Sequence, residues 1–210
     1  MPDSSFLKNL LEQGLGFYQL NAHLEQSTIL LAYVELLEKW NRTYNLTAIK
    51  DKQEMVYRHI LDSLSIHQYI AGENCLDVGS GAGLPGLVLS IVQPDKHWTL
   101  LDSNSKRTRF LRHVKAHLDL HNVEVVQQRI DEYQPEKLYS TITCRAFSSM
   151  NDFVEQSGHC LEKSGLMLAM KAHLKVAEWE AVKSKVADIE RIYLATMDDE
   201  KTRCLVKISL

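Results

Sequence analysis

The spacing of apolar residues divides the chain into a helical first part and a second part in which strands alternate with helices. Residues 27–40 carry apolar side chains at intervals of three and four, which predicts an amphipathic helix. A second helix is predicted around residues 55–64. The helical pattern ends near residues 71–74, so we expect a helical extension over residues 1–72. Residues 73–210 should form a second domain that packs with the extension as one globular unit.

The second part contains short apolar runs separated by segments long enough for crossover helices. These runs are 75–79, 97–102, 123–128, 141–146 and 166–171. Such alternation predicts an α/β fold with a parallel sheet covered on both faces, whose ligands bind at the carboxyl ends of the strands. Two last runs, 191–196 and 203–210, have only a short polar connection, which predicts an antiparallel hairpin at the sheet.

Composition fits a cytoplasmic globular protein. Of the 210 residues, 45% are hydrophobic and 24% charged. No apolar run approaches the roughly 20 residues of a membrane helix, and the first residues lack the layout of a secretory signal. The four cysteines, at 75, 144, 160 and 204, form no ligand-like cluster. We interpret them as buried reduced thiols and expect no metal site.

The net charge of −3 argues against a surface that is basic throughout, but one segment is strongly basic. Residues 106–115 carry five cationic side chains and no acid. If this segment is helical, Phe110, Leu111 and Val114 form its buried stripe. The candidate RNA-binding residues are then Lys106, Arg107, Arg109 and Arg112. From the pattern alone, a solvated helix face is an equally good interpretation.

The strongest chemical signal is the glycine-rich turn that follows the strand at 75–79. Gly79, Gly81 and Gly83 allow positive φ and let a ligand approach the backbone closely. The helix that follows directs unpaired N–H groups at that ligand, which favours an anionic group. Both a dinucleotide and S-adenosylmethionine fit this description.

Two acidic residues favour S-adenosylmethionine over NAD. Asp77 precedes the first glycine, where it would disfavour a pyrophosphate but could receive the amino group of a methionine moiety. Asp102 ends the next strand and is placed to bind ribose hydroxyls. An NAD-dependent oxidoreductase remains the alternative, because Asp102 also lies about 20 residues beyond the turn, as a dinucleotide site requires.

Five segments together carry a resemblance to a known family. They are WNRTYNLT (40–47), RHILDSL (58–64), LDVGSGAGLPGLVLSIVQP (76–94), LLDSNSKRTRFLR (100–112) and CRAF (144–147). The chain resembles the bacterial 16S ribosomal RNA guanine-N7 methyltransferases, also called glucose-inhibited division protein B, strongly over residues 25–150. The resemblance implies a Rossmann-like class I S-adenosylmethionine-dependent methyltransferase. Its sheet would have seven strands, the last antiparallel, and its substrate would be a guanine in the decoding-region loop of the small subunit.

The resemblance also implies individual cofactor contacts. Gly79 and Leu84 lie in the turn, Ile130 and Asp131 follow the third strand, and Arg145 follows the fourth. Where the family often has serine before that arginine, this chain has Cys144.

The expected chemistry needs no general base, because guanine N7 already carries an in-plane lone pair. We therefore expect no essential histidine or cysteine nucleophile. Arg145 is the candidate catalytic residue, since arginine pairs with the Hoogsteen edge of guanine, although a cofactor or structural contact is an equally good interpretation. Because that edge must be accessible, the expected partner is 16S rRNA within a small ribosomal subunit or its precursor, bound by a monomer.

Other interpretations remain open or are rejected. His59, Asp62 and Ser63 share a helix face, but no nucleophile elbow accompanies the serine, so we reject a hydrolase. The resemblance places these residues beside the active-site mouth, with Asn45 and Thr47, and helix packing explains them equally well. Trp40 and Tyr44 could stack on RNA bases but fit a core as well. The alternatives are a methyltransferase of another acceptor and a non-catalytic RNA-binding protein.

Overall fold

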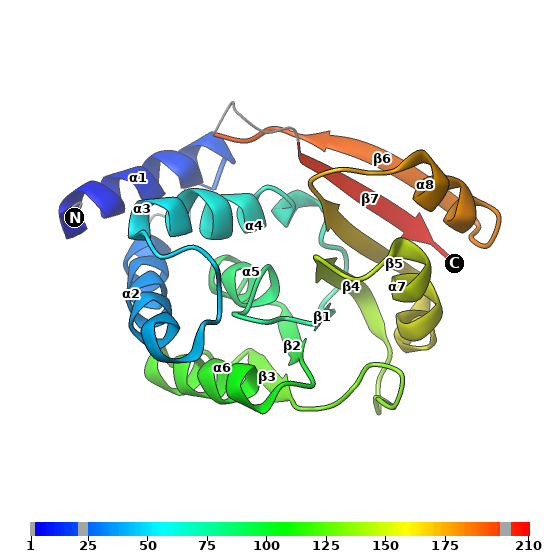
Figure 1. The fold of residues 1–210 in the computed structure, drawn as a ribbon, viewed down its shortest axis with the longest axis horizontal. Helices are drawn as coiled ribbons and strands as arrows, with labels where there is room; N and C mark the ends of the chain where they lie inside the picture. The colour runs from blue at the N-terminus through cyan, green and yellow to red at the C-terminus, as the bar shows by residue number, and fades with distance from the viewer. Residues whose placement is uncertain (1–2, 21–24, 198–202) are drawn as a thin grey trace.

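The computed structural model describes residues 3–20, 25–197 and 203–210 and contains one seven-stranded sheet (Figure 1). The strand order is β3-β2-β1-β4-β5-β7-β6. The strands are β1 Asn74–Val78, β2 His97–Leu101, β3 Val123–Val126, β4 Tyr139–Arg145, β5 Leu161–Lys171, β6 Asp188–Leu194 and β7 Arg203–Ser209.

Pairing in the sheet follows the predicted topology. β1 to β5 pair in parallel, whereas β7 is antiparallel to both β5 and β6. The predicted α/β sheet with its last strand antiparallel, and the predicted terminal hairpin pairing, are confirmed. The strand order reverses between β1 and β4, so the chain leaves these two neighbouring strands in opposite directions. A ligand crevice is expected at this point, outside the carboxyl ends of the strands.

Helices surround the sheet. They are α1 Ser4–Phe17, α2 Ser27–Tyr44, α3 Lys52–Met55, η2 Val56–Leu61, α4 Asp62–Leu64, α5 Gly86–Val92, α6 Ser105–His117, α7 Met150–Ser157 and α8 Val176–Lys183, with short turns η3 His67–Tyr69 and η4 Gly158–Cys160. The second predicted helix is the continuous run α3-η2-α4, and its middle part is a π-helix. The Asp51 side chain caps this run by accepting a hydrogen bond from the backbone N–H of Glu54.

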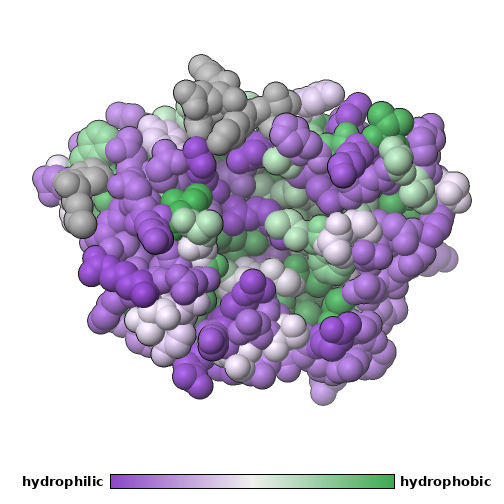
Figure 2. All heavy atoms as spheres, viewed as in Figure 1, coloured by the Kyte–Doolittle hydropathy of each residue, from purple (hydrophilic) through white to green (hydrophobic). Residues whose placement is uncertain are grey.

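The face shown in Figures 1 and 2 is hydrophilic around its rim. Toward its middle, between α4 and α6 of Figure 1, hydrophobic residues are exposed in a hollowed region. α5, β1 and β4 lie in this part of Figure 1, where the ligand crevice is expected. Within the described part of the chain, no helix is both long and apolar enough to span a membrane.

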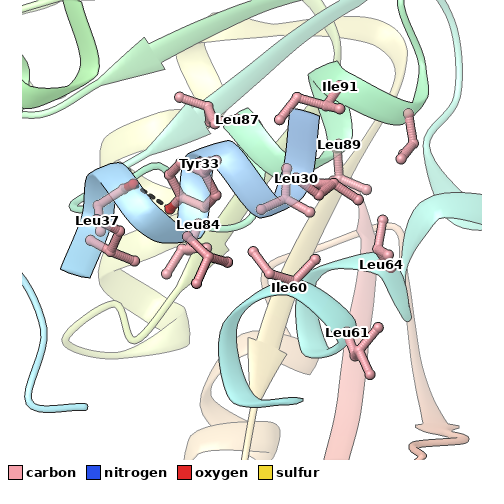
Figure 3. Packing of buried hydrophobic residues seen from close by; sticks show 14 of the residues in the cluster. Leu30, Tyr33, Leu37, Ile60, Leu61, Leu64, Leu84, Leu87, Leu89 and Ile91 are labelled. Atoms are coloured by element: carbon pink, nitrogen blue, oxygen red, sulfur yellow. Dashed lines mark hydrogen bonds between the residues drawn. The ribbon is translucent and has the colours of Figure 1, made fainter. Parts of the chain in front are cut away.

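The core lies on both faces of the sheet. On one face, Leu30 and Leu37 of α2 belong to one buried cluster with Leu87 and Leu89 of α5 and Ile60 of η2 (Figure 3). The other face is covered by α7 and α8, whose buried apolar side chains join those of β4 and β5. The helical extension is therefore built into the main core, because its apolar stripe has no other surface to cover.

One connection differs from the sequence-based expectation. Residues 127–138, between β3 and β4, form no helix, so the predicted crossover helix at this place is wrong. The segment is mostly polar and contains Pro135, so it offers no apolar stripe to bury against the sheet. Its loop leaves a hollow of about 700 Å³, lined by Thr99, Glu124 and Tyr139 among others, toward the amino ends of the strands.

The shared core predicts a large cost for Leu30→Ala. Leu30 of α2 is fully buried in the core that the extension shares with α5. Its truncation should therefore lower the free energy of unfolding by about 2–5 kcal/mol. Glu35→Ala, at an exposed position of the same helix, should change it by less than about 0.5 kcal/mol. Urea unfolding of both variants measures this, and equal effects would contradict a core that unites the extension with the sheet.

Candidate active site

The glycine-rich turn folds back over the end of β1 because its backbone takes positive φ three times. The φ angles are 69° at Gly79, 58° at Gly81 and 96° at Gly83. The N–H groups of Gly79 and Ser80 both donate to the carbonyl of Leu101, at 2.8 and 3.1 Å, which ties the turn to the end of β2. A Cβ built on Gly79 would meet no atom within 4 Å. The turn therefore leaves a cradle that a ligand, rather than a side chain, can fill.

Asp77 lies beneath this turn and holds it from below. Its carboxylate is fully buried and accepts hydrogen bonds from the backbone N–H of Gly86, at 3.0 Å, and from the Thr143 hydroxyl, at 3.1 Å. A Cβ on Gly86 would lie 2.6 Å from the Cβ of Asp77, so only glycine permits this approach. Burial raises the pKa of Asp77 to about 6, although the Gly86 and Thr143 donors oppose the shift.

Asp102 holds the turn from the side by a hydrogen bond. It follows β2, and its Oδ2 accepts from the backbone N–H of Gly81 at 2.9 Å and from Nη1 of Arg107 at 3.3 Å. Its Oδ1 accepts from the backbone N–H of Asn104 at 2.8 Å. The two acids that the sequence marks out thus both hold the turn, one from beneath and one beside it.

A hollow of about 170 Å³ opens beside the turn, and we call it the loop hollow. Four predicted cofactor residues line it, namely Gly79, Asp102, Ile130 and Asp131. The Arg129 guanidinium forms two hydrogen bonds to the Asp131 carboxylate, at 3.0 and 2.8 Å, and these bonds lower the pKa of Asp131. Residues from the ends of β1, β2 and β3 are therefore brought together, as the strand pattern predicts.

The other predicted cofactor residues lie around this hollow without lining it. Gly81 and Gly83 shape the turn, and Asp77 lies below it. The Leu84 side chain belongs to the core, where Figure 3 shows it close to residues of α2.

A second hollow, of about 620 Å³, lies beyond the end of β4, and we call it the arginine hollow. Arg145 lines it together with Arg58 and Asp62 of the extension and Arg203 of β7. The two residues after Arg145 face different hollows, since Ala146 lines the arginine hollow and Phe147 the loop hollow. Ala146 has a φ of 60°, a backbone strain of the kind that often occurs at functional sites.

Asp62 organises the arginine hollow. Its Oδ1 accepts from Nε of Arg203 at 3.0 Å, and its Oδ2 accepts from Nη1 of Arg145 at 3.2 Å. The same Nη1 of Arg145 donates to the carbonyl of Arg58 at 3.1 Å. The side chain of Asp62 is only 10% exposed, so these ion pairs are shielded from water. One carboxylate therefore fixes two guanidinium groups from distant parts of the chain.

The lining of the arginine hollow is left with a positive charge. Besides Arg145 and Arg203, two more cations line the hollow, and each pairs with a carboxylate of its own. Arg58 pairs with Glu54 at 2.7 Å, and Lys171 pairs with Glu178 at 2.6 Å. Four cations, Arg58, Arg145, Lys171 and Arg203, thus face three carboxylates, Glu54, Asp62 and Glu178, which leaves one positive charge in excess. Apolar residues such as Ile49 and Met170 complete the wall. The hollow suits a flat polar group that carries hydrogen-bond acceptors.

His59 does not form a hydrolase triad with its neighbours. Its Nε2 lies 2.8 Å from the Thr47 hydroxyl, while the Ser63 hydroxyl donates to the backbone carbonyl of His59 rather than to its ring. Burial and then the nearby Arg145 charge lower the pKa of His59 to about 4. The ring is therefore neutral at neutral pH, and the rejection of a hydrolase stands. Asn45, the other residue expected near this mouth, ends α2 in a left-handed conformation.

The predicted basic segment forms α6. Phe110, Leu111 and Val114 are buried, as its spacing predicts. The four predicted RNA-binding residues, Lys106, Arg107, Arg109 and Arg112, are all exposed. Arg107 also lines the loop hollow, so this surface is continuous with the glycine-rich turn.

Trp40 and Tyr44 lie where α2 meets α6. The Trp40 ring centroid is 5.6 Å from that of Phe110 and 5.1 Å from those of Tyr44 and His113. Both side chains are only half-buried. Packing between two helices accounts for the contacts of Trp40, which favours the core interpretation.

Sequence reasoning missed three contributors to the arginine hollow. Arg58 lies within the RHILDSL segment, where its position one turn before Asp62 on a helix was an available signal. Arg203 and Lys171 reach the site only through the pairing of β7 with β5, which no local sequence pattern reveals.

The burial of Asp77 predicts a pH effect on stability. Its pKa is about 6 in the folded protein against 3.8 for the free group, so the protonated carboxyl stabilises the fold below about pH 4. That contribution is lost as the pH rises through about 6. The free energy of unfolding of Asp77→Asn, relative to the unsubstituted protein, should therefore increase by up to about 3 kcal/mol between pH 4 and 7.

Urea unfolding at both pH values measures this difference. Asp95→Asn, at an exposed position, is the control for removing a surface carboxylate. A difference for Asp77→Asn that does not change with pH would contradict the buried environment of this carboxyl group.

Comparison with known proteins identifies the family of this chain. A family described as "rRNA small subunit methyltransferase G" matches residues 26–203. A Ribosomal RNA small subunit methyltransferase G from Nitrosococcus oceani is 45% identical over 201 residues, which cover 96% of this chain and 94% of that protein. One from Hydrogenovibrio crunogenus is 47% identical over 181 residues, covering 85% and 83%. An Escherichia coli relative of the same name is 41% identical over 184 residues, covering 87% and 89%.

Solved structures support the fold. An S-adenosylmethionine-dependent methyltransferase from Aquifex aeolicus matches with a TM-score of 0.59 and 15% identity, over 79% of this chain and 97% of that one. A putative O-methyltransferase from Nostoc punctiforme matches with a TM-score of 0.61 and 11% identity, over 75% of this chain and 58% of that one. The family match extends along most of the chain, which contains the glycine-rich turn and the two acids that hold it. These findings show that the chain belongs to the rRNA small subunit methyltransferase G family.

Proposed function

We propose that this chain transfers the methyl group of S-adenosylmethionine to N7 of a guanine in 16S ribosomal RNA. The observation that carries the proposal is that two hollows lie on either side of the segment that follows β4, at the carboxyl edge of the sheet. The glycine-rich turn borders one and positively charged arginines border the other, and the end of β4 runs between them. A cofactor and an acceptor could thus approach one another across Ala146 and Phe147.

The loop hollow suits S-adenosylmethionine. The bare backbone of Gly79 leaves room for the cofactor, and Asp102 and Asp131 present carboxylate oxygens that hydroxyl and amino groups can donate to. Ile130 supplies an apolar wall. Bound there, the cofactor supplies an electrophilic methyl group on a sulfonium. The carboxylate of Asp77 lies directly beneath the turn, where it disfavours the pyrophosphate of NAD and suits a positively charged ligand.

The arginine hollow suits a guanine base. The N7 and O6 atoms of guanine are neighbouring acceptors, and an arginine guanidinium can donate to both. Asp62 holds the Arg145 guanidinium at the wall of the hollow. Because N7 carries a free lone pair, no side chain has to remove a proton, and the neutral His59 need not act as a base. The rate enhancement would come from orientation, which can supply about 7–11 kcal/mol.

Arg107 of α6 lines the loop hollow, and the exposed cations of the same helix suit the phosphates of the RNA. Lys106, Arg109 and Arg112 form no ion pair among the described residues, so they are available to phosphates. The Hoogsteen edge of the guanine has to be accessible, which favours a loop of the rRNA within a small subunit or its precursor over a regular helix. One copy of the chain contains both hollows, which is consistent with action as a monomer.

Transfer of labelled methyl from S-adenosylmethionine tests the proposal directly. Small-subunit particles from cells that lack this protein should acquire 7-methylguanine at one position of 16S rRNA, as mapped by mass spectrometry. Arg145→Ala should lower kcat/KM by about 5- to 150-fold, the range for one paired base contact. Lys163→Ala, at the opposite edge of the sheet, is the matched control and should leave kcat/KM unchanged. Label on another atom, or no label on RNA, would contradict the proposal.

The α6 surface predicts a change in salt dependence. Arg109→Glu with Arg112→Glu should weaken binding to small-subunit rRNA and reduce the slope of log K against log salt by about 0.7–0.9 for each phosphate that the variant no longer neutralises. The affinity for S-adenosylmethionine should stay the same, because neither residue lines the loop hollow. Lys163→Glu is again the control. A slope that matches that of the unsubstituted protein would assign RNA binding to another surface.

A further inference from the structure

Tyr33 of the helical extension reaches the glycine-rich turn through its hydroxyl group. The side chain is fully buried, and its Oη donates to the backbone carbonyl of Ala82 at 2.7 Å, as Figure 3 shows. Ala82 lies within the turn, between Gly81 and Gly83. An element outside the sheet therefore contacts the segment that shapes the loop hollow.

This bond adds an anchor to those that the residues of the sheet and its strand ends supply. Asp102, directly after β2, holds the N–H of Gly81, and Asp77 of β1 holds the N–H of Gly86. Tyr33 holds the carbonyl of Ala82 from α2, which lies outside the sheet and packs in the same core as the turn. Glycines on both sides of Ala82 give the free turn many alternative conformations. These anchors, together with the bonds of the turn to the Leu101 carbonyl, select one of these conformations.

Packing alone does not explain the hydroxyl. The buried residues of α2 within one turn of Tyr33 are the apolar Leu30, Val34 and Leu37, and phenylalanine would fill the same space. A buried hydroxyl is unfavourable unless it is hydrogen-bonded. Burial also raises the pKa of Tyr33, so the group remains a donor at physiological pH. Ala82 is itself buried, and its carbonyl would lack this partner without the tyrosine.

We propose that Tyr33 is a positioning residue for S-adenosylmethionine, holding the glycine-rich turn in its binding conformation before the cofactor arrives. This inference rests on the proposed function and adds that the extension controls cofactor affinity. Preorganisation lowers the entropy that a ligand loses by ordering its site. Without the tether, the turn has to be ordered on binding, so affinity for the cofactor falls while the chemistry is unchanged.

The test compares Tyr33→Phe with Leu11→Ala. Leu11 is fully buried in α1 and belongs to the same core, but it has no hydrogen bond to the turn. Calorimetry measures the Kd for S-adenosylmethionine, urea unfolding measures stability, and methyl transfer gives kcat and both KM values. Tyr33→Phe should raise the Kd and KM for S-adenosylmethionine by about 3- to 10-fold, the range of one neutral hydrogen bond. Its kcat at saturating cofactor and its KM for RNA should stay within about twofold.

Leu11→Ala should lower stability by more than Tyr33→Phe does, and yet leave the Kd for S-adenosylmethionine within about twofold. Amide hydrogen exchange adds a readout that does not depend on activity, since Gly83 and Leu84 should exchange faster in Tyr33→Phe without cofactor. A Kd for Tyr33→Phe equal to that of the unsubstituted protein would overturn the inference and leave the proposed function intact. Failure of the unsubstituted protein to bind S-adenosylmethionine would overturn both.

Discussion

The contact between Asp77 and Gly86 is the constraint on which the site depends. The buried carboxylate receives the Gly86 N–H at 3.0 Å, and a Cβ at Gly86 would lie only 2.6 Å from the Cβ of Asp77. This approach brings the start of α5 down onto the end of β1, so the chain between them has to turn sharply over the edge of the sheet. The positive φ angles of Gly79, Gly81 and Gly83 follow from that path. Burial of the Asp77 carboxylate lowers stability, but its hydrogen bond to Gly86 closes the turn that forms the candidate cofactor site.

The helical extension completes this site from two directions. Tyr33 contacts the glycine-rich turn, and Asp62 pairs with arginines from β4 and β7 at the wall of the arginine hollow. The apolar stripes of α1, α2 and η2 share one core with α5 and α6, so the positions of these polar contacts are set by packing. The extension therefore belongs to the candidate active site as well as to the core. The family match begins at residue 26, before β1, so it includes α2 and the run α3-η2-α4 of the extension.

Much of the fold and the residues around the glycine-rich turn could be predicted from the sequence. Apolar runs and glycines are local signals, so the sheet, the glycine-rich turn, Gly79 and Asp102 were accessible from the pattern, whereas Ile130 and Asp131 came from the family resemblance. The side-chain environments were not, because they depend on contacts between distant segments. Asp77 was expected to meet the cofactor directly, yet it lies beneath the turn with both oxygens bound by protein groups. The partnership of Asp62 with Arg203 spans most of the chain, and only the pairing of β5 with β7 brings it about.

The most direct test asks where S-adenosylmethionine binds, because the larger hollow of about 700 Å³ lies at the opposite edge of the sheet from the loop hollow. Amide hydrogen exchange with and without the cofactor distinguishes the two places. We predict slower exchange at residues 79–86 and 129–131, with no change at residues 121–124 and 133–137. Protection confined to the residues of the larger hollow would contradict this assignment, since neither the glycine-rich turn nor the acids that hold it would then form the cofactor site.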